Sequence, residues 1–230
     1  MHESTDEHLL EHILADNDAL AQHNRKHFDE SDICAVNLMS APGAGKTSLL
    51  EASIVRLPKE TRSCVIEGDM VGELDVERLK KAGVEAFQIC TGRSCHLDAK
   101  MVARLLHNNS FENCDLLFIE NVGNLVCPAE FPLGEHKRVV LLSVTEGDDK
   151  PLKYPVIFRN CDAVVFTKCD LLPHVNFNPD MAMRHIEAIN PAVAFFAVSA
   201  VTGQGLDKWV NWLDEQASFP MPAKAATVKG

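Results

Sequence analysis

The sequence predicts an α/β fold: a doubly wound, mostly parallel sheet flanked by helices and preceded by an N-terminal helical arm. Three observations predict it. From residue 33 onward, short apolar segments alternate with segments of helical pattern. The apolar segments are rich in β-branched residues and continuous, as strands buried on both faces of a parallel sheet are. A glycine-rich turn joins the first apolar segment to a helical one, where such sheets bind ligands.

The predicted elements follow one another in regular alternation. Strands are expected at 33–39, 64–67, 86–90, 116–120, 139–144, 163–167 and 193–198. Helices are expected at 45–56, 76–81, 97–107, 181–189 and 206–217. Before them, residues 5–30 carry leucine and isoleucine at helical spacing and predict an amphipathic helix. We therefore expect an arm at 1–32, one domain at 33–218 and a flexible tail at 219–230.

Composition and charge exclude several classes of function. The 230 residues carry a net charge of −11, which argues against a nucleic-acid groove or an anionic membrane surface as partner. The apolar runs are too short for a membrane helix, and the acidic N-terminus lacks a signal-peptide pattern, so we expect a cytoplasmic protein. The eight cysteines form no CxxC pair and are expected to be thiols or metal ligands. Cys34, Cys64 and Cys90 fall in predicted strands and are expected in the core.

A phosphate-binding loop follows the first predicted strand. The segment SAPGAGKT matches the Walker A pattern G-x-x-x-x-G-K-[ST], except that Ser40 replaces the first glycine. Gly43 and Gly45 allow the tight turn that points successive N–H groups at a phosphate. Lys46 is expected to meet the β- and γ-phosphates, and the Thr47 hydroxyl to bind Mg²⁺. The loop residues expected to bind the nucleotide are Gly43, Ala44, Gly45, Lys46, Thr47 and Ser48.

Acidic residues follow two of the predicted strands at the edge that faces this loop. Asp69 and Asp75 come after the second strand, and Glu120 closes the fourth. Carboxylates at this edge can hold Mg²⁺ or its waters, although any single one could be a solvated loop charge. Gly123 is expected to offer its N–H to the γ-phosphate, as in the D-x-x-G element of GTPases. We predict catalytic roles for Lys46, Thr47, Asp75 and Glu120, and Mg²⁺ contacts from Thr47, Asp69, Asp75 and Glu120.

A base-reading motif closes the sixth predicted strand. The segment TKCD resembles the N-K-x-D pattern of GTPases, with Thr167 in place of Asn. The Asp170 carboxylate can accept hydrogen bonds from guanine N1–H and N2–H₂, which adenine does not offer together. The Lys168 stem is expected to pack on the base, and the Ala200 N–H of the Ser199-Ala200 pair that ends the last strand to donate to guanine O6. Because Thr167 lacks an amide that ties loops together, we expect GTP with a looser base site.

A set of soft metal ligands lies beside these motifs. Cys95 and His96 precede a predicted helix, and Cys127 follows the strand that ends at Glu120. Two thiolates and an imidazole suit Zn²⁺ and equally Ni²⁺. The set is one short of a closed tetrahedral site, so a water or a second chain would complete it. By spacing alone, however, such a set is more often accidental.

Four segments together resemble one known family. NLMSAPGAGKTSLL, TGRSCHLDAKMV, ENVGNLVCP and VTEGDDKPLKYP are similar to segments of the hydrogenase nickel-incorporation GTPases of the HypB type, and the resemblance extends over about residues 10–217. It implies a cytoplasmic homodimer that forms on binding GTP, hydrolyses GTP to GDP slowly with Mg²⁺, and delivers Ni²⁺ to the hydrogenase large subunit precursor. It also implies a HypA-type nickel/zinc maturation protein as partner and a Ni²⁺ or Zn²⁺ site at Cys95, His96 and Cys127.

The resemblance has two departures. Some members carry an N-terminal CCGC-type nickel site or a histidine-rich stretch, whereas this chain starts MHESTDEHLLEH. We therefore expect the site at Cys95 to carry the metal function. The second departure is Thr167.

These observations support the hypothesis of a GTP-driven metal switch, in which loop order links the two sites. Lys150 and Lys153 could reach a neighbour's nucleotide in a dimer, with plain surface charge as the alternative. Two other functions stay open at this point. One is a P-loop small-molecule kinase with a structural zinc, and the other is a zinc-stabilised scaffold with a vestigial GTP site.

Overall fold

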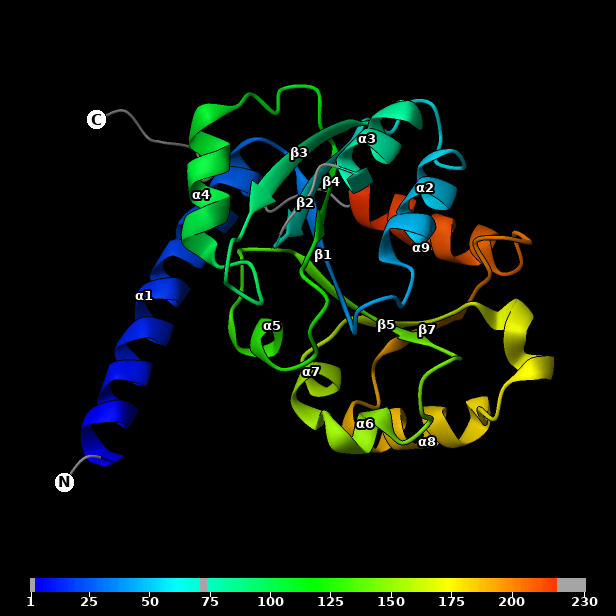
Figure 1. Ribbon diagram of the computed structural model, residues 1–230. Helices are drawn as coiled ribbons and strands as arrows, with labels where there is room; N and C mark the ends of the chain where they lie inside the picture. The colour runs from blue at the N-terminus through cyan, green and yellow to red at the C-terminus, as the bar shows by residue number, and fades with distance from the viewer. Residues whose placement is uncertain (1–2, 71–73, 219–230) are drawn as a thin grey trace.

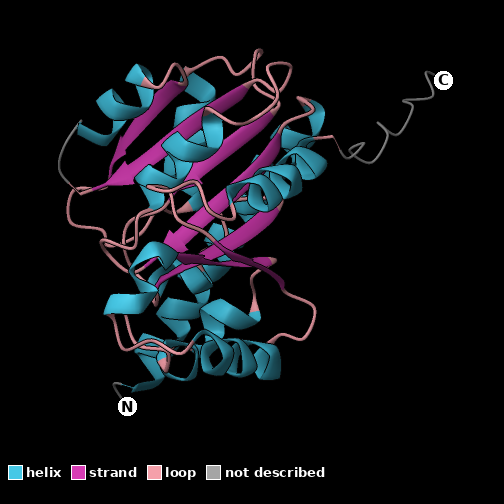
Figure 2. Cartoon of the chain, turned by 90° about the vertical axis from the view of Figure 1, so that its right-hand side faces the viewer, coloured by secondary structure: helices cyan, strands magenta, loops and turns pink. Residues whose placement is uncertain are grey.

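A seven-stranded parallel sheet runs through the computed structural model, which describes residues 3–70 and 74–218 (Figures 1 and 2). Its order is β3-β2-β4-β1-β5-β6-β7, and neighbouring strands are parallel throughout. The strands are β1 (Cys34–Ser40), β2 (Ser63–Asp69), β3 (Glu85–Cys90), β4 (Leu116–Glu120), β5 (Lys137–Ser143), β6 (Ala163–Thr167) and β7 (Ala194–Ala197). The predicted fold class is thus confirmed.

Helices precede, connect and follow the strands. These are α1 (Glu3–Glu30), α2 (Lys46–Ile54), α3 (Leu74–Lys81), α4 (Ala99–Asn108), α5 (Cys127–Glu130), α6 (Lys150–Lys153), α7 (Pro155–Arg159), the 3-10 helix η1 (Cys169–His174), α8 (Pro179–Ile189) and α9 (Leu206–Ala217). The expected helix at 97–107 begins later, because the Asp98 side chain caps it by accepting from the Met101 N–H. Four short helices, α5, α6, α7 and η1, were not predicted, since so few residues show no helical periodicity.

Helices cover both faces of the sheet. On one face α2, α3 and α9 pack through Leu49, Leu79 and Trp209 against alternate strand residues such as Val36 and Phe118. On the other face α1 and α4 cover β1, β2 and β4, while α7 and α8 cover β5 and β6. Every residue of β4 and β6 is buried. This explains the continuous apolar strands in the sequence.

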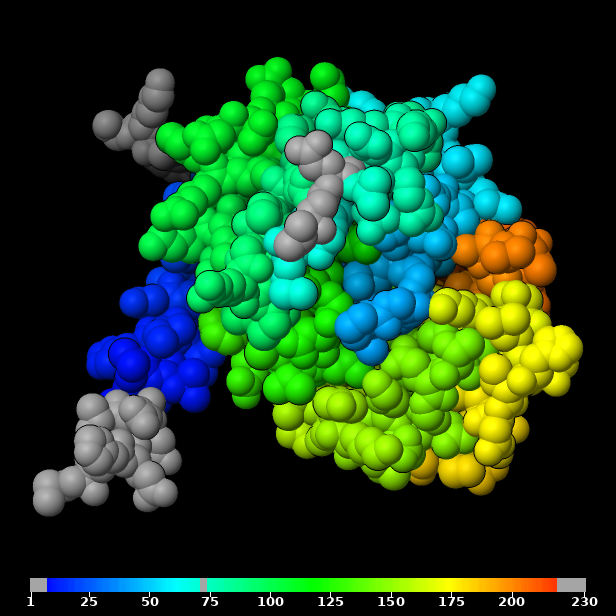
Figure 3. All heavy atoms as spheres, viewed as in Figure 1, coloured from blue at the N-terminus to red at the C-terminus, as the bar shows by residue number. Residues whose placement is uncertain are grey.

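The N-terminal helix α1 leans on this second face and extends beyond it (Figures 1 and 3). Its C-terminal part is anchored by Phe28, which is fully buried. Towards its N-terminus, Leu9, Leu10 and Ile13 are exposed. None of the described helices is long and apolar enough to cross a membrane. The expected tail at 219–230 lies outside the described residues.

The strand order reverses at β1, which lies between β4 and β5. In such sheets the crevice beyond the carboxyl end of that strand binds ligands. The loops that follow β1, β2, β4 and β6 therefore meet at one edge of the sheet.

The burial of the cysteines depends on their place in the sheet. Cys34 and Cys64 are buried as expected. Cys90 was also expected in the core but is exposed, because it ends the edge strand β3.

Candidate functional site

The phosphate loop turns directly from β1 into α2. Gly43 and Gly45 have φ angles of +72° and +94°, in the left-handed region that side chains rarely adopt. Gly45 is the N-cap of α2, so the helix begins with its N–H groups at the loop. The loop therefore has the backbone of a phosphate-binding turn.

Lys46 and Thr47, the first residues of α2, point into a buried polar cluster. The Lys46 ammonium donates to Ser40 Oγ at 3.1 Å, so the serine that replaces the first Walker glycine provides an anchor for the lysine. Burial lowers the pKa of Lys46, and the carboxylates of Glu120 and Glu67 oppose this shift. Thr47 Oγ1 donates to Glu120 Oε1 at 2.9 Å. The structure thus brings together three of the four predicted catalytic residues.

A second glutamate, which the sequence analysis did not select, belongs to this cluster. Glu67 on β2 is aligned with Glu120 on β4, and both are buried. Among the described residues, Glu67 Oε2 and Glu120 Oε2 are buried oxygens without a hydrogen-bond partner. Burial, then the neighbouring carboxylate, raises the pKa of Glu67 to about 8, and burial raises that of Glu120 to about 7. Such oxygens fit a hard divalent cation or its waters, which would supply the missing charge.

The other two acids predicted to bind Mg²⁺ stand further out. Asp69 Oδ1 accepts from the Met70 N–H at 2.6 Å. Asp75, in the first turn of α3, pairs with Arg78 at 2.9 Å, and Arg78 also pairs with Glu51. The structure does not bring these two carboxylates into contact with Thr47, and their predicted role stays a prediction.

Gly123 packs directly against the phosphate loop. A Cβ atom at this position would lie 2.8 Å from Pro42 Cα, which is closer than real Cβ atoms approach. Only glycine allows the chain after β4 to lie on the loop here. The Gly123 backbone is therefore held on the phosphate loop, as its predicted role requires.

A cavity of about 290 Å³ opens on the other side of the phosphate loop. Its lining residues are Ala44, Gly45, Ser48, Leu49, Thr167, Lys168, Asp170, Leu171, Val198, Ala200 and Val201. The predicted base reader thus surrounds a largely apolar space suited to a flat ring. Ser199 Oγ donates to Asp170 Oδ1 at 2.6 Å and orients the carboxylate.

Two bonds tie the base reader to the phosphate loop. Thr167 Oγ1 donates to the Ala44 carbonyl at 2.6 Å, and the Lys168 ammonium donates to the Gly43 carbonyl at 2.7 Å. The expectation that Thr167 leaves this tie open is therefore wrong, because its hydroxyl makes a bond of its own. Lys168 itself has a left-handed backbone, with φ +59°. The base-reading and phosphate-binding loops are thus directly linked.

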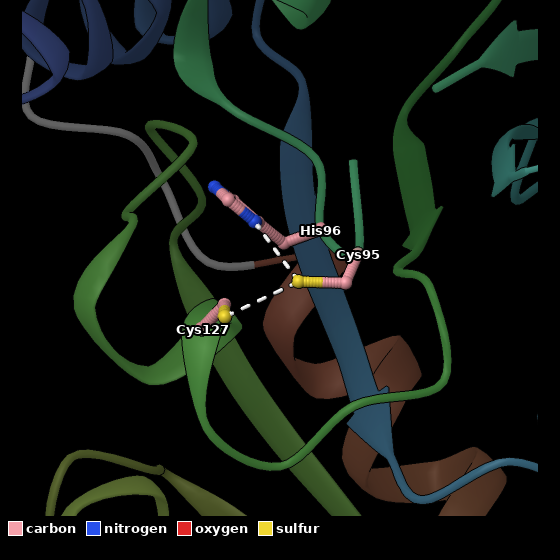
Figure 4. Close-up of side chains that lie close together, drawn as sticks. All are labelled: Cys95, His96 and Cys127. Atoms are coloured by element: carbon pink, nitrogen blue, oxygen red, sulfur yellow. Dashed lines mark hydrogen bonds between the residues drawn. The ribbon is translucent and has the colours of Figure 1, made fainter. Parts of the chain in front are cut away.

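Cys95, His96 and Cys127 come together as predicted (Figure 4). The Sγ atoms of Cys95 and Cys127 are 3.3 Å apart, and Cys95 Sγ lies 3.8 Å from His96 Nδ1. Two thiolates on a tetrahedral Zn²⁺ would lie about 3.8 Å apart, given metal–sulfur bonds of about 2.3 Å. Burial lowers the pKa of His96 and so favours the neutral imidazole that binds metals. Within the described residues this is the one group of three such side chains close enough to share an ion.

Two loops carry this triad. After β3, the Thr91 hydroxyl donates to the Ser94 carbonyl at 2.8 Å and shapes the turn before Cys95. After β4, the chain reaches Cys127 at the start of α5, and Asn124 Nδ2 donates to the Cys95 carbonyl at 3.3 Å. The His96 ring contacts the Phe131 ring, with centroids 4.2 Å apart. The ligands thus lie on the segments that follow β3 and β4, the two neighbours of β2, and β2 carries Glu67.

Lys150 and Lys153 both have partners within the chain. Lys150 pairs with Glu146 at 3.0 Å and lies over the Tyr154 ring, and Lys153 pairs with Asp149 at 2.6 Å. Whether either acts across a dimer stays a prediction.

Comparison with known proteins shows the family to which this chain belongs. The model of the CobW/HypB/UreG nucleotide-binding domain matches residues 34–197. The chain is 47% identical over 206 residues to the hydrogenase maturation factor HypB of Rhizobium leguminosarum bv. viciae, covering 90% of this chain and 69% of that protein. The chain belongs to the HypB family of hydrogenase maturation factors.

Solved structures of HypB proteins share the fold. HypB from Helicobacter pylori, solved in complex with nickel, has a TM-score of 0.82 and 39% identity, covering 88% of this chain and 95% of that one. HypB from Archaeoglobus fulgidus has a TM-score of 0.83 and 42% identity, covering 88% and 99%. The match to the CobW/HypB/UreG nucleotide-binding domain begins at residue 34, so α1 lies outside the residues matched by that model.

Proposed function

We propose that this protein is a GTP-hydrolysing metallochaperone of low turnover that assists nickel insertion into [NiFe] hydrogenase. GTP binds between the phosphate loop and the base reader, and Ni²⁺ is the cargo of Cys95, His96 and Cys127. The observation that carries the proposal is that these three ligand groups lie within 4.8 Å of one another, on segments that leave the same edge of the parallel sheet as the phosphate loop. Family membership supports it, since relatives are named hydrogenase maturation factors.

The nucleotide chemistry follows from the buried cluster. Lys46 and the α2 N-terminus neutralise phosphate charge, while Thr47, Glu120 and Glu67 offer oxygens to Mg²⁺. Mg²⁺, when bound, would supply charge stabilisation of the transferring phosphate. Thr47 donates to Glu120, and Lys46 is the cationic group of the cluster. We propose slow turnover because the carboxylates of this cluster are assigned to Mg²⁺, which leaves none of the described groups of the cluster as a base for the attacking water.

The two sites are joined through Leu97, the residue after His96. Its N–H donates to Asn121 Oδ1 at 3.1 Å, and Asn121 directly follows Glu120. Its side chain covers Gly68, where an added Cβ would lie 2.7 Å from it, between Glu67 and Asp69. These two contacts connect the γ-phosphate side of the site to the backbone next to His96. We propose that nucleotide state and metal affinity are coupled by this contact.

A homodimer completes the proposal. The triad offers three ligands, one short of a closed tetrahedral site, and Cys95 is exposed. A second copy that brings its own triad would close the shell. GTP-dependent dimerisation, a HypA-type metal donor and the hydrogenase large subunit precursor are the partners we propose.

Metal titration with and without nucleotide tests the proposal. Ni²⁺ and Zn²⁺ are titrated into wild type in the GDP-bound and GTP-analogue-bound states, while the mass of the species is recorded. We expect different metal affinities in the two states and a dimer with the GTP analogue. Equal affinities in both states would contradict the coupling.

Cys95→Ala is the variant for the metal site, and Cys90→Ala is its control. Cys90 is an exposed cysteine of the same strand–loop unit. We expect the first variant to lose stoichiometric metal binding and the second to keep it. Unchanged metal stoichiometry in Cys95→Ala would refute the site.

A separate measurement tests the alternative function of a small-molecule kinase. Rapid GTP consumption that occurs only after a small phosphate acceptor is added would favour a kinase instead.

A further inference from the structure

The helix α1 touches both loops of the metal triad through two buried asparagines. Asn17 is 6% exposed and Asn24 is fully buried. They lie two helical turns apart and so share one face of α1. Three of their four side-chain polar atoms make hydrogen bonds, and among the described residues Asn24 Oδ1 has no partner. Their partners therefore indicate what the helix is positioned to hold.

On the Cys95 side, both asparagines bind one residue. The Ala99 N–H donates to Asn17 Oδ1 at 2.9 Å, and Asn24 Nδ2 donates to the Ala99 carbonyl at 2.9 Å. Ala99 begins α4, three positions after His96. The backbone that leaves the Cys95-His96 turn is therefore held by α1 through its donor and its acceptor.

On the Cys127 side, the same two amides bind neighbouring carbonyls. Asn17 Nδ2 donates to Pro132 O at 2.8 Å, and Asn24 Nδ2 donates to Leu133 O at 2.9 Å. These carbonyls follow α5, which begins at Cys127. Each asparagine therefore bridges the two segments that carry the ligands.

Further contacts fix this second segment on the helix. Arg25 Nε donates to the Gly134 carbonyl at 2.9 Å. A Cβ at Gly134 would lie 2.6 Å from the Ala21 carbonyl, and its φ of +98° also requires glycine. The backbone at Gly134 thus packs directly against the backbone of α1, with no room for a side chain between them. Between the two anchors, Phe131 meets the His96 ring.

We propose that Asn17 and Asn24 are positioning residues for the metal triad, which clamp its two loops at a fixed separation. The inference rests on the proposed metal site. The Cys95 and Cys127 sulfurs belong to different loops, so metal affinity depends on how well the loops are pre-arranged. Asn17 and Asn24 precede residue 34, where the match to the nucleotide-binding domain begins, so under this proposal α1 adds a contribution to the metal site from outside that domain.

The test compares metal affinity among variants of the full chain. Asn17→Leu removes both hydrogen bonds at similar volume, and Asn17→Asp keeps the acceptor for Ala99 but loses the donor to Pro132. Gln22→Leu makes the same amide-to-leucine change at an exposed position of α1. Affinities for Zn²⁺ and Ni²⁺ are measured by competition with a chromophoric chelator, and GDP affinity is measured without metal.

We expect Asn17→Leu to bind each metal about 10- to 100-fold more weakly, as other losses of outer-shell support do. Asn17→Asp should lie between it and wild type, Gln22→Leu should match wild type, and GDP affinity should not change. A metal affinity equal to wild type in folded Asn17→Leu would overturn the clamp. So would an equal loss of metal and GDP affinity, which indicates general destabilisation.

Hydrogen exchange in wild type gives a measurement that needs no variant. The clamp requires the Ala99 N–H to exchange slowly in the metal-free protein, and exchange as fast as in exposed loops would overturn it. Cys95→Ser separates the two proposals. If it binds metal like wild type, the metal site itself is wrong. If it loses metal while Asn17→Leu does not, only the clamp is wrong.

Discussion

Glu67 and Glu120 are aligned on the adjacent strands β2 and β4, and each has a buried oxygen without a hydrogen-bond partner. Two buried carboxylates that are register partners on adjacent strands cannot both ionise without a cation between them or close by. Lys46 supplies one positive charge, and a divalent cation would supply more. When both carboxylates are ionised, they therefore repel each other at the centre of the site.

Glu67→Gln is expected to relieve this repulsion. The pKa of Glu67 rises from 4.5 in a free chain to about 8 in the fold, so folding favours the protonated form. Its stabilising contribution is present at acid pH and is lost as the pH rises to that value. The melting temperature of the variant should exceed that of wild type most at a pH above the Glu67 pKa of about 8. The variant should also bind Mg²⁺–GDP more weakly. Glu77→Gln, exposed on α3, should change neither.

The close sulfurs of Cys95 and Cys127 predict sensitivity to oxidation. A thiol oxidant such as diamide would take two electrons and two protons from the pair and leave an intrachain disulfide. We expect metal-free protein to lose two free thiols and its Ni²⁺ binding together, and bound Zn²⁺ to protect it. Thiol titration and intact mass detect the change. Formation of the same disulfide in Cys127→Ser would be impossible, so equal thiol loss there would contradict this pairing.

Asp170→Asn is expected to impair guanine recognition. Two hydrogen bonds to a charged group are worth about 1.5–3 kcal/mol each, so GDP affinity should fall by roughly 10²- to 10⁴-fold. Xanthine nucleotides carry an acceptor where guanine has its amino group and should bind the variant better than GDP. Fluorescence titration with labelled nucleotides measures both. Asp180→Asn, an exposed residue of α8, serves as the control and should bind GDP normally.

Asn121→Ala is expected to uncouple the sites. It removes the Oδ1 that accepts from the Leu97 and Val122 N–H groups and the Nδ2 that donates to Asn37, while the metal triad and the phosphate loop keep their side chains. The ratio of metal affinities in the GTP and GDP states, typically 5- to 150-fold in coupled systems, should fall towards one. Each ligand should still bind alone. The same ratio in the variant as in the exposed control Asn109→Ala would show that coupling takes another route.

His136 predicts a loss of stability in mild acid. Its Nδ1 accepts from the Ala35 N–H at 2.9 Å, so the neutral ring carries its proton on Nε2, which faces Asp29 at 2.9 Å. Burial lowers the pKa of His136 despite the attraction of Asp29. Folding therefore disfavours the charged ring, and stability falls as the pH drops below about 6.5, where the unfolded chain takes up a proton.

Urea unfolding between about pH 5 and 7 measures this effect. His136→Asn keeps an acceptor near the Nδ1 position and cannot titrate, so its stability should vary less with pH. His107→Asn, at an exposed position of α4, should follow the wild-type curve. A wild-type pH dependence in His136→Asn would assign the acid sensitivity to another group.

Sequence reasoning succeeded where a motif is local. The phosphate loop, the base reader and the seven strands are each encoded by consecutive residues, and the structure contains them. Glu67 was missed because its importance lies in the strand beside it, which pairing alone reveals. A glutamate within an apolar strand was the available signal. Thr167 was misjudged because its hydroxyl replaces an amide by reaching a different partner, the Ala44 carbonyl.

The polar contacts on the inward face of α1 could not be predicted from the sequence for a related reason. Asn17 and Asn24 look like ordinary polar positions of an exposed helix. Only the packing of α1 on α4 and on the segment after α5 turns them inward. Periodicity locates apolar faces, but it does not locate a polar face that binds backbone.

The contact between Gly123 and Pro42 limits where the metal can travel. Cys127 follows Gly123 by four residues, a tether that spans at most about 14 Å when fully extended. While Gly123 stays on the phosphate loop, no rearrangement carries the Cys127 sulfur out of the nucleotide's neighbourhood. Under the proposed function, a nickel ion bound at Cys127 would therefore be handed over close to the nucleotide, and the acceptor would have to approach that part of the molecule.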